Sequence, residues 1–473
     1  MTYPEAIQFL YRLRWFGAKF GLDNTFKLAA LAGNPQSRLR FIHVAGTNGK
    51  GSTCAMLESI YRTAGLRVGL FTSPHLVAFG ERIQVNRESI PDAEVGRLAD
   101  EMRRLLEKNW QTAEPHGANP GAETPGSAVI PAVVVAGKDG PGTQGETASP
   151  ASSTKEHPTF FEVVTVMALR HFAEQKCDLV IWETGLGGRL DATNIVTPLV
   201  SIITNIQFDH QQYLGETLAS IAAEKAGIIK PAVPVITGAD APEALAVIEA
   251  TARRRNSPLT VVAASASDAP PLSEIRLPLL GRHQRFNAAL ALAAVRTLAP
   301  VMPVAEAAIR SGLAQLHWAG RLQLVTRPGG QRILLDGAHN TGGADILAAA
   351  LREYFPSSRP ALVLGILRDK DWPAMCRTLA PLAGRILLVP VPSERTAEPH
   401  GLAEACHKAN PAAPVTEYPS LAAALRDTAG DPFVTIAGSL YLIGEAMELL
   451  HLSAAQAGDE RGLNEWTPPA RGL

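Results

Sequence analysis

The sequence predicts an α/β protein in which a parallel-sheet domain with a phosphate-binding loop is followed by a smaller, Rossmann-like α/β domain. First, the 473 residues exceed the length of one ordinary domain. Second, strand-like and helix-like segments alternate along most of the chain, which is typical of parallel sheets covered by helices on both faces. Third, a glycine-rich turn separates an apolar run from a helical pattern near residue 46, as in a phosphate-binding loop.

The first block of alternating segments extends from about residue 41 to residue 299. Apolar runs rich in β-branched residues predict strands. These strands are expected at 41–45, 67–71, 178–183, 199–205, 233–237 and 259–262. Helical patterns lie between them, for example at 160–175 and 217–229.

A second alternating block begins near residue 321. It predicts strands at 332–336, 361–366, 385–391 and 433–436, and helices at 341–354, 372–382 and 401–409. We therefore expect a first domain over 1–316, with the boundary near Leu316, and a second over 317–453.

Two segments lack such patterns. Residues 112–157 are crowded with Ala, Gly, Pro, Ser and Thr, which indicates a flexible insertion. A short strand at 128–136 and a role as a substrate lid are the alternatives there. Residues 454–473 are expected to form a loosely ordered tail.

The segment from Phe41 to Thr53 carries the strongest chemical pattern. Small residues at its turn let backbone N–H groups converge on phosphate oxygens at a helix N-terminus, Lys50 adds positive charge, and Ser52 or Thr53 offers a hydroxyl near a metal. The generic phosphate loop has Gly six residues before the Lys and Ser or Thr directly after it, positions held here by Val44 and Gly51. A glycine-rich turn that binds no phosphate is the alternative.

A second motif runs from Trp182 to Asn194. Glu183 ends an apolar strand, so it is expected at the crevice where open α/β sheets bind ligands. In phosphate-loop proteins an acid on a neighbouring strand helps to hold Mg²⁺. The alternative is a carboxylate that caps the following turn.

Of two further motifs, one contains a histidine that could bind a metal, and the other contains a lysine in a predicted helix. His210 follows the strand predicted at 199–205 and suits a divalent ion in a mixed nitrogen and oxygen shell, although a lone His is more often a surface or hydrogen-bonding residue. Lys225 lies in a predicted helix among apolar neighbours. There it is either a salt-bridged surface residue or, when desolvated, an amine that can lose its proton and take up CO₂ as a carbamate.

Composition excludes several classes of protein. The net charge of −1 provides no basic surface for nucleic acid, and no apolar run approaches the roughly 20 residues of a membrane span. The four cysteines are scattered without a C-x-x-C pair, which suits a reducing cytosol and argues against a zinc site. The N-terminus does not resemble a secretory signal. We expect a cytoplasmic monomer.

The order Gly-Thr-Asn-Gly-Lys-Gly-Ser at 46–52 resembles the loop of the Mur-type amide ligases. Together with the other motifs it resembles the folylpolyglutamate synthase/dihydrofolate synthase family of the Mur ligase group, from about Tyr3 to Leu450 except in the insertion. The supporting matches are Asn24, 71–76, 281–287, 319–323, 336–340, 368–371 and 438–441. Thr184 and Ala319 depart from the usual Val and Pro of the family without removing a ligand.

The resemblance implies a role for each motif. The ATP contacts would be Asn48, Gly49, Lys50, Gly51, Ser52, Asn287, Arg321, Asp336 and His339. Ser73 and Glu183 would hold one Mg²⁺ ion, and His210 a second beside Lys225, which matches a carbamylated lysine. The pterin and substrate region would contain Phe160, Phe161, Glu162, Leu190, Asp191 and Ala192. Lys50, Lys225 and His210 are the expected catalytic residues.

The implied activity is an ATP-dependent amide ligation through an acyl phosphate, with L-glutamate as the amine and a folate or dihydropteroate as the carboxylate. The chain length and the match at 190–192 favour both acceptors over either one alone. The alternatives are a related ligase that acts on a cell-wall precursor and a nucleotide-dependent switch without ligase chemistry. The polyglutamate chain length stays open.

Overall fold

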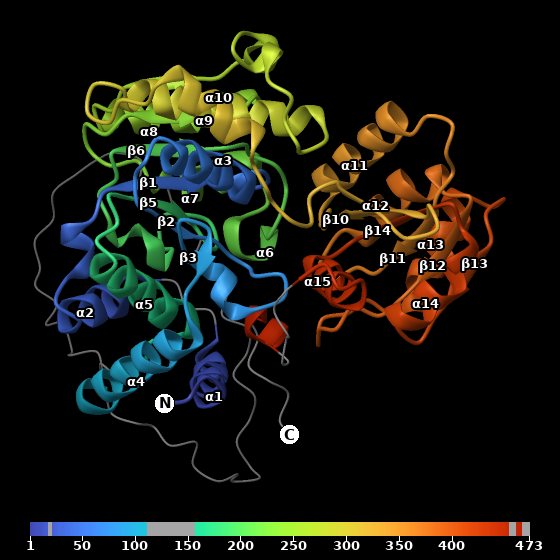
Figure 1. Ribbon diagram of the computed structural model, residues 1–473, viewed down its shortest axis with the longest axis horizontal. Coiled ribbons are helices and arrows are strands. Elements are labelled where there is room, and N and C mark those ends of the chain that lie inside the picture. Colours follow the sequence, from blue (N-terminus) through green and yellow to red (C-terminus); the bar gives the residue numbers. More distant parts are fainter. Residues whose placement is uncertain (18–20, 111–156, 454–459, 466–473) are drawn as a thin grey trace, which may run out of the picture.

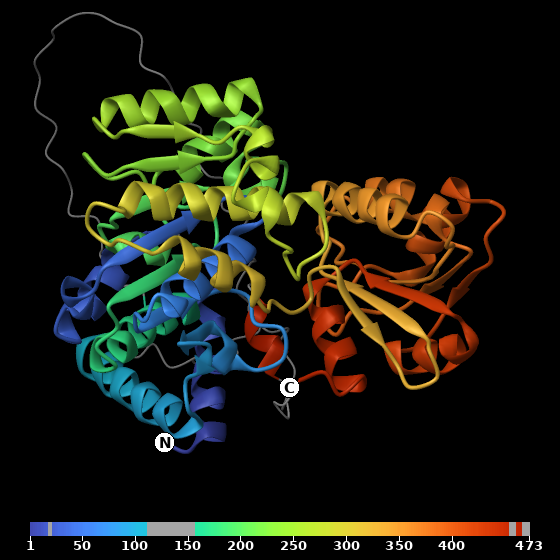
Figure 2. The same ribbon diagram turned by 45° about the horizontal axis from the view of Figure 1, so that its top comes forward.

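The computed structural model describes residues 1–17, 21–110, 157–453 and 460–465. These residues form two α/β domains that lie side by side (Figures 1 and 2). The insertion expected at 112–157, with its possible strand and lid, lies outside the described residues except for His157.

The first domain is built on an eight-stranded sheet with the order β4-β3-β2-β5-β1-β6-β7-β8. Its strands are mainly parallel, and β3 and β4 form an antiparallel edge. The strand bounds are β1 Phe41–Ala45, β2 Val68–Phe71, β3 Ile83–Val85, β4 Glu88–Ser89, β5 Leu179–Glu183, β6 Val200–Ile203, β7 Val235–Thr237 and β8 Leu259–Val261.

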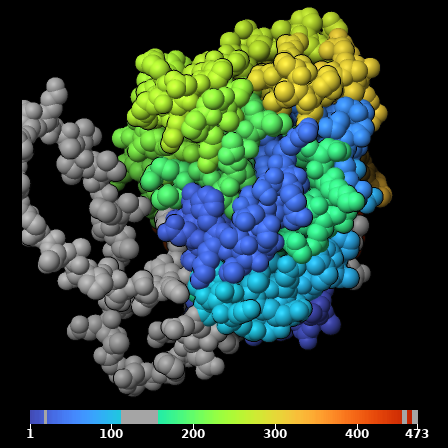
Figure 3. Space-filling model, turned by 90° about the vertical axis from the view of Figure 1, so that its left-hand side faces the viewer, coloured from blue at the N-terminus to red at the C-terminus, as the bar shows by residue number. Residues whose placement is uncertain are grey.

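Helices cover both faces of this sheet. They are α1 Tyr3–Leu13, α2 Asp23–Leu31, α3 Lys50–Thr63, α4 Asp92–Asn109, α5 Phe160–Glu174, α6 Gln211–Leu214, α7 Leu218–Ala226, α8 Pro242–Arg254, α9 Arg282–Leu298 and α10 Glu306–Ala314. Helices α2 and α4 lie on the face turned away from the second domain (Figure 3). One core centres on Trp182 of β5, whose ring stacks on Phe71 of β2 at 4.5 Å between centroids.

The second domain has a six-stranded sheet with the order β13-β12-β11-β14-β10-β9, in which β9 is antiparallel. Its strands are β9 Gln323–Thr326, β10 Arg332–Asp336, β11 Ala361–Leu364, β12 Arg385–Leu388, β13 Val415–Glu417 and β14 Phe433–Ala437. Its helices are α11 Thr341–Tyr354, α12 Trp372–Leu379, α13 Pro399–Ala409, α14 Leu421–Asp427 and α15 Leu440–Leu449.

The predicted fold class of two parallel-sheet α/β domains is confirmed, and each strand expected from an apolar run is present. The hydrophobic cores separate between Leu316, which packs in the first domain, and Leu322, which packs in the second. Among the described residues no helix is both long and apolar enough to cross a membrane.

The prediction of a loosely ordered tail over 454–473 is wrong for residues 460–465. They contain a short 3₁₀ helix, Glu460–Asn464, called η9 here. Leu463 is buried in the core of the first domain, and buried polar residues flank it. Tertiary contacts therefore order a segment that has no periodic pattern of its own.

The turn after β1 depends on glycine. Gly46 has φ +146°, and a Cβ atom built there would lie 1.9 Å from Oγ1 of Thr204. That hydroxyl donates a 2.6 Å hydrogen bond to the carbonyl of Asn48, so it cannot move without loss of this bond. The end of β6 is thereby packed directly against the turn that follows β1.

We expect Gly46→Ala to lower the free energy of unfolding by roughly 1–3 kcal/mol more than Gly65→Ala, because overpacking adds to backbone strain. Gly65 is the matched control, since it has φ +91° and no atom within 4 Å of a built Cβ. Its substitution should cost about 1–2 kcal/mol from left-handed backbone alone. Urea unfolding followed by tryptophan fluorescence measures both values. Equal losses would show that the contact with Thr204 is not tight.

Candidate active site

Three neighbouring strands of the first sheet end at the same edge and carry the predicted motifs. In register, Val44 of β1 lies opposite Glu183 of β5 on one side and Ile202 of β6 on the other. The phosphate loop follows β1, and the segment with Asp209 and His210 follows β6. Because parallel strands present their carboxyl ends together, the topology brings these motifs to one cleft.

The phosphate loop leads into α3 as the sequence predicts. The helix begins at Lys50, after Gly49 in the left-handed conformation with φ +85°. The Lys50 ammonium donates hydrogen bonds to the carbonyls of Gly46 at 3.0 Å and Thr47 at 3.2 Å. The N-terminus of α3 and this cation make a site suited to phosphate oxygens.

Lys225 is not a surface residue. It is 4% exposed on α7, and its ammonium donates a 2.9 Å hydrogen bond to the same Gly46 carbonyl. Burial, followed by the positive charge of Lys50, lowers the pKa of Lys225 to about 7. The salt-bridged surface alternative is therefore wrong, and the neutral amine needed for carbamate formation is accessible near neutral pH.

Glu183 and Ser73 are neighbours at the cleft. The Ser73 backbone N–H donates a 3.2 Å hydrogen bond to Oε2 of Glu183. Burial raises the pKa of Glu183 to about 7 against the opposing charge of Lys50. A buried carboxylate of this kind is stabilised in its ionised form when a cation approaches.

Asp209 joins the two domains at this cleft. Its Oδ1 forms an ion pair with the Lys370 ammonium at 2.6 Å, and its Oδ2 accepts a 3.0 Å hydrogen bond from the Asn340 side chain. Lys370 and Asn340 both belong to the second domain. Burial works to raise the pKa of Asp209, but the adjacent cationic groups hold it well below its usual range. Burial lowers the pKa of the next residue, His210, to about 3. His210 is therefore neutral at pH 7, as a metal ligand must be.

The nucleotide cleft contains all the residues expected to bind ATP or metal. It is lined by Asn48, Gly49, Lys50, Gly51, Ser52, Ser73, Glu183, His210, Lys225, Asn287, Arg321, Asp336 and His339. Asp336 also holds local backbone, because its carboxylate accepts hydrogen bonds from the N–H groups of Leu322 at 2.8 Å and Ala338 at 3.0 Å. Within the described residues no group of three or more His, Cys, Asp or Glu forms a ready metal cage.

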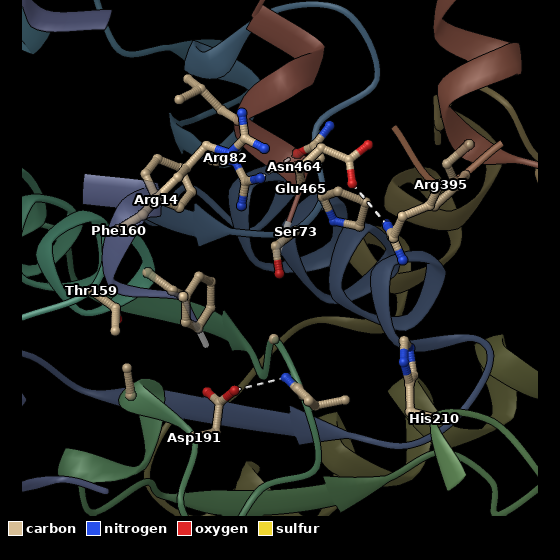
Figure 4. Close-up of a pocket in the computed structure, with 18 of the residues that line it drawn as sticks. Arg14, Ser73, Arg82, Thr159, Phe160, Asp191, His210, Arg395, Asn464 and Glu465 are labelled. Atoms are coloured by element: carbon tan, nitrogen blue, oxygen red, sulfur yellow. Dashed lines mark hydrogen bonds and ion pairs between the residues drawn. The ribbon is translucent and has the colours of Figure 1, made fainter. Parts of the chain in front are cut away.

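A second cavity adjoins the cleft and contains all the residues expected to bind substrate (Figure 4). These are Phe160, Phe161, Glu162, Leu190, Asp191 and Ala192. The Asp191 carboxylate accepts hydrogen bonds from the N–H groups of Leu186 at 2.7 Å and Thr193 at 3.0 Å, and burial raises its pKa. Ser73, His210 and His339 line both cavities, so the two form one continuous site.

Sequence reasoning assigned no role to several polar residues of the second cavity. They are Arg14, Arg82, Lys370, Arg395, Ser439, Tyr441, Asn464 and Glu465. Lys370, Ser439 and Tyr441 lie in segments that matched the family without a stated role. Arg82 ends the 3₁₀ helix Phe79–Arg82, and Arg395 lies in a turn. Both stand in no motif, so only tertiary structure identifies them.

A phosphate loop that faces a second α/β domain, with an apolar cavity joined to the cleft, defines an ATP-dependent ligase of the Mur type. Residues 136–295 match the model of the Mur ligase middle domain, and residues 320–440 match that of the Mur ligase glutamate ligase domain. The chain is 37% identical to the dihydrofolate synthase/folylpolyglutamate synthase of Bacillus subtilis, over 81% of this chain and 84% of the relative. It is 32% identical to the folylpolyglutamate synthase of Lacticaseibacillus casei, over 95% and 99%.

Among solved structures, Escherichia coli FolC in complex with DHPP and ADP superposes with a TM-score of 0.75 at 28% identity. The match covers 96% of this chain and 98% of that one. The chain belongs to the folylpolyglutamate synthase/dihydrofolate synthase family.

Proposed function

We propose that the nucleotide cleft and the adjoining cavity are two halves of one active site that meets near Ser73 and His210. As a member of its family, the chain is an ATP-dependent ligase that adds L-glutamate to folate or dihydropteroate. We assign this activity to the two cavities because they are continuous through Ser73, His210 and His339. A phosphate donor and a carboxylate acceptor can therefore lie against each other.

The reaction begins when an acceptor carboxylate oxygen attacks the γ-phosphorus of ATP and ADP leaves. The amine of L-glutamate then attacks the acyl carbon of the acyl phosphate, phosphate leaves, and the amine loses a proton. Phosphoryl transfer requires positioning and charge neutralisation rather than a protein nucleophile. The N–H groups at the start of α3 and the Lys50 ammonium would hold the phosphates, while Asn287, Arg321, Asp336 and His339 would contact the rest of the nucleotide.

The residues present fit Mg²⁺. Glu183 lies beside Ser73, burial raises its pKa, and a cation would stabilise its buried carboxylate. Neutral His210 and a carbamylated Lys225 would supply nitrogen and oxygen to a second ion. Mg²⁺ bound there would supply charge neutralisation for the phosphates, and since this ion usually keeps several water ligands, a closed protein cage would not be required.

The acceptor cavity supports a pterin-bearing carboxylate. Phe160 and Phe161 provide aromatic surface at the start of α5, and Asp191 provides a fixed carboxylate. We propose that dihydropteroate and folates both bind there. We further propose that the protein is cytoplasmic, since the four cysteines are buried and free, as in proteins of a reducing compartment. That it acts as a monomer stays a proposal.

The function is tested by assay of purified protein with ATP, L-glutamate and either dihydropteroate or tetrahydrofolate. We expect turnover with both acceptors. Lys50→Ala should leave less than about a tenth of it, because the phosphates lose their cation while the core is unchanged. The control is Lys108→Ala at an exposed position of α4. Full activity of Lys50→Ala would contradict the site, and turnover with one acceptor alone would contradict dual specificity.

Mg²⁺ binding should weaken as the pH falls. The raised pKa of about 7 means that Glu183 becomes protonated below pH 7, and only the carboxylate binds metal. The apparent dissociation constant for Mg²⁺ in the presence of ATP should rise about tenfold per pH unit below 7. Calorimetric titration at several pH values measures this constant.

Glu183→Gln should abolish that pH dependence and reduce activity most at limiting Mg²⁺. Glu162→Gln is the matched control, because Glu162 lines the neighbouring cavity and its carboxylate caps α5 by accepting a 2.7 Å hydrogen bond from the Thr159 N–H. A glutamine can keep such a cap. Equal losses in the two variants, neither reduced by added Mg²⁺, would contradict the metal role.

Lys225 should carry a carbamate, and Lys225→Ala should be nearly inactive. Nuclear magnetic resonance after exchange with ¹³C-labelled bicarbonate should show a carbamate signal that Lys225→Ala lacks. A short carboxylic acid at high concentration should partly restore the variant by placing a carboxylate near the metal. Lys230→Ala is the control, since the Lys230 ammonium instead donates a 2.9 Å hydrogen bond to the Asn194 carbonyl. A signal that persists in Lys225→Ala would assign the carbamate elsewhere.

A further inference from the structure

The segment 460–465 is attached to both domains. On the first domain, Leu463 is 1% exposed, and the Glu460 carboxylate accepts hydrogen bonds from the Tyr3 hydroxyl at 2.9 Å and the Phe79 N–H at 2.6 Å. On the second domain, Arg461 pairs with Glu448 of α15. In Figure 1 this short red helix lies against the first domain, next to α15 of the second. Its position is therefore fixed by contacts on two sides.

The end of this segment forms part of the wall of the second cavity, where Leu463, Asn464 and Glu465 all line it. Asn464 accepts a hydrogen bond from Arg82. Oε2 of Glu465 lies 2.8 Å from Nε of Arg395, and its other oxygen accepts a hydrogen bond from the Ser393 hydroxyl (Figure 4). The Glu465 side chain is 3% exposed. The segment thus places a glutamate side chain, bound by its carboxylate, inside the substrate cavity.

Arg395 belongs to the second domain, within the part that matches the glutamate ligase domain. Its guanidinium also lies 3.1 Å from Asp369 and donates a 3.2 Å hydrogen bond to the Tyr441 hydroxyl. Two carboxylates against one guanidinium give this cluster a net negative charge. A carboxylate of a bound substrate would be repelled from Arg395 while Glu465 stays, and would be attracted once Glu465 has moved away.

We propose that Glu465 occupies the subsite for the side-chain carboxylate of the incoming L-glutamate and competes with it for Arg395 and Ser393. The competing group has the same chemistry as the substrate, a carboxylate on two methylene carbons. L-Glutamate binding then requires Glu465 to leave, so the residue sets the concentration at which the amino acid is used. The inference rests on the proposed function, in which this cavity holds the substrates.

The test compares Glu465→Gln with the wild type in steady-state kinetics. The apparent dissociation constant of a ligand equals its intrinsic value divided by the fraction of molecules whose site is free to bind it. If Glu465 covers Arg395 in about nine of ten molecules, KM for L-glutamate should fall roughly tenfold in the variant. KM for ATP should stay unchanged, because Glu465 does not line the nucleotide cleft. Glutarate, which has both carboxylates and no amine, should inhibit the variant competitively at a lower concentration than the wild type.

Glu448→Gln is the matched control. Glu448 pairs with Arg461 of the same segment, and this contact lies outside the cavity wall. The variant therefore removes a carboxylate–arginine pair without touching the cavity. Glu465→Asp provides a second variant that keeps the charge with a shorter side chain. A KM for L-glutamate that is unchanged or raised in Glu465→Gln, or one that falls equally in Glu448→Gln, would overturn the proposal. Absence of glutamate-dependent turnover in the wild type would instead contradict the proposed function.

Discussion

The Asp209 carboxylate holds the two domains together at the cleft, and the geometry of the site depends on this contact. Its partners Lys370 and Asn340 come from the second domain, and the side chains of Asp209 and Lys370 are 7% and 6% exposed. Breaking a buried ion pair by removal of one partner costs about 3–5 kcal/mol. Asn340 also exchanges hydrogen bonds with Asn48 of the phosphate loop, at 3.1 and 3.2 Å. The conformation of that loop is therefore coupled to the position of the second domain.

The Gly46 carbonyl explains the electrostatics of the first domain's half of the site. Two ammonium groups, from Lys50 and Lys225, donate to this one oxygen at 3.0 and 2.9 Å. Burial lowers the pKa of Lys225, and the nearby positive charge of Lys50 lowers it further. At the proposed site, the polyphosphate of ATP would relieve the repulsion between these ammonium groups at Lys50, and the proposed carbamate would relieve it at Lys225 by replacing a cation with an anion. The same arrangement would thus favour both the proposed nucleotide and the proposed modification.

Most of the framework and the cleft could be predicted because parallel strands impose simple rules. Buried strands give continuous apolar runs, and ligands lie at their carboxyl ends. Glu183 and His210 were placed in the site by those rules and by the family motifs. The strands β3, β4 and β9 escaped prediction because they are short antiparallel strands without continuous apolar runs, and β13 escaped it as a three-residue parallel strand at the sheet edge. Neither burial nor charge could be deduced for Lys225, since both depend on the packing of α7 against the phosphate loop.

The contacts of Arg82, Arg395 and Glu465 could not be predicted for a different reason. Each links segments far apart in the chain; Arg82 and Asn464, for example, are 382 positions apart. No local pattern marks such a pair, and a polar tail with few apolar residues predicts disorder on composition alone. The tail becomes ordered because Leu463 enters a core and Glu460 satisfies a backbone N–H and a hydroxyl.

Asp209 and Glu465 form similar ion pairs with different roles: the first links the two domains, and the second can be replaced by a substrate. Both carboxylates neutralise a cation that lines the substrate cavity, Lys370 in one case and Arg395 in the other. Asp209 follows β6 of the first sheet and bridges two domains, so its departure would leave the buried Lys370 ammonium without this partner. Glu465 follows the short 3₁₀ helix η9, and Arg395 keeps Asp369 and Tyr441 as partners when Glu465 moves. A substrate carboxylate can therefore replace the carboxylate of Glu465, but not that of Asp209, without leaving an uncompensated buried charge.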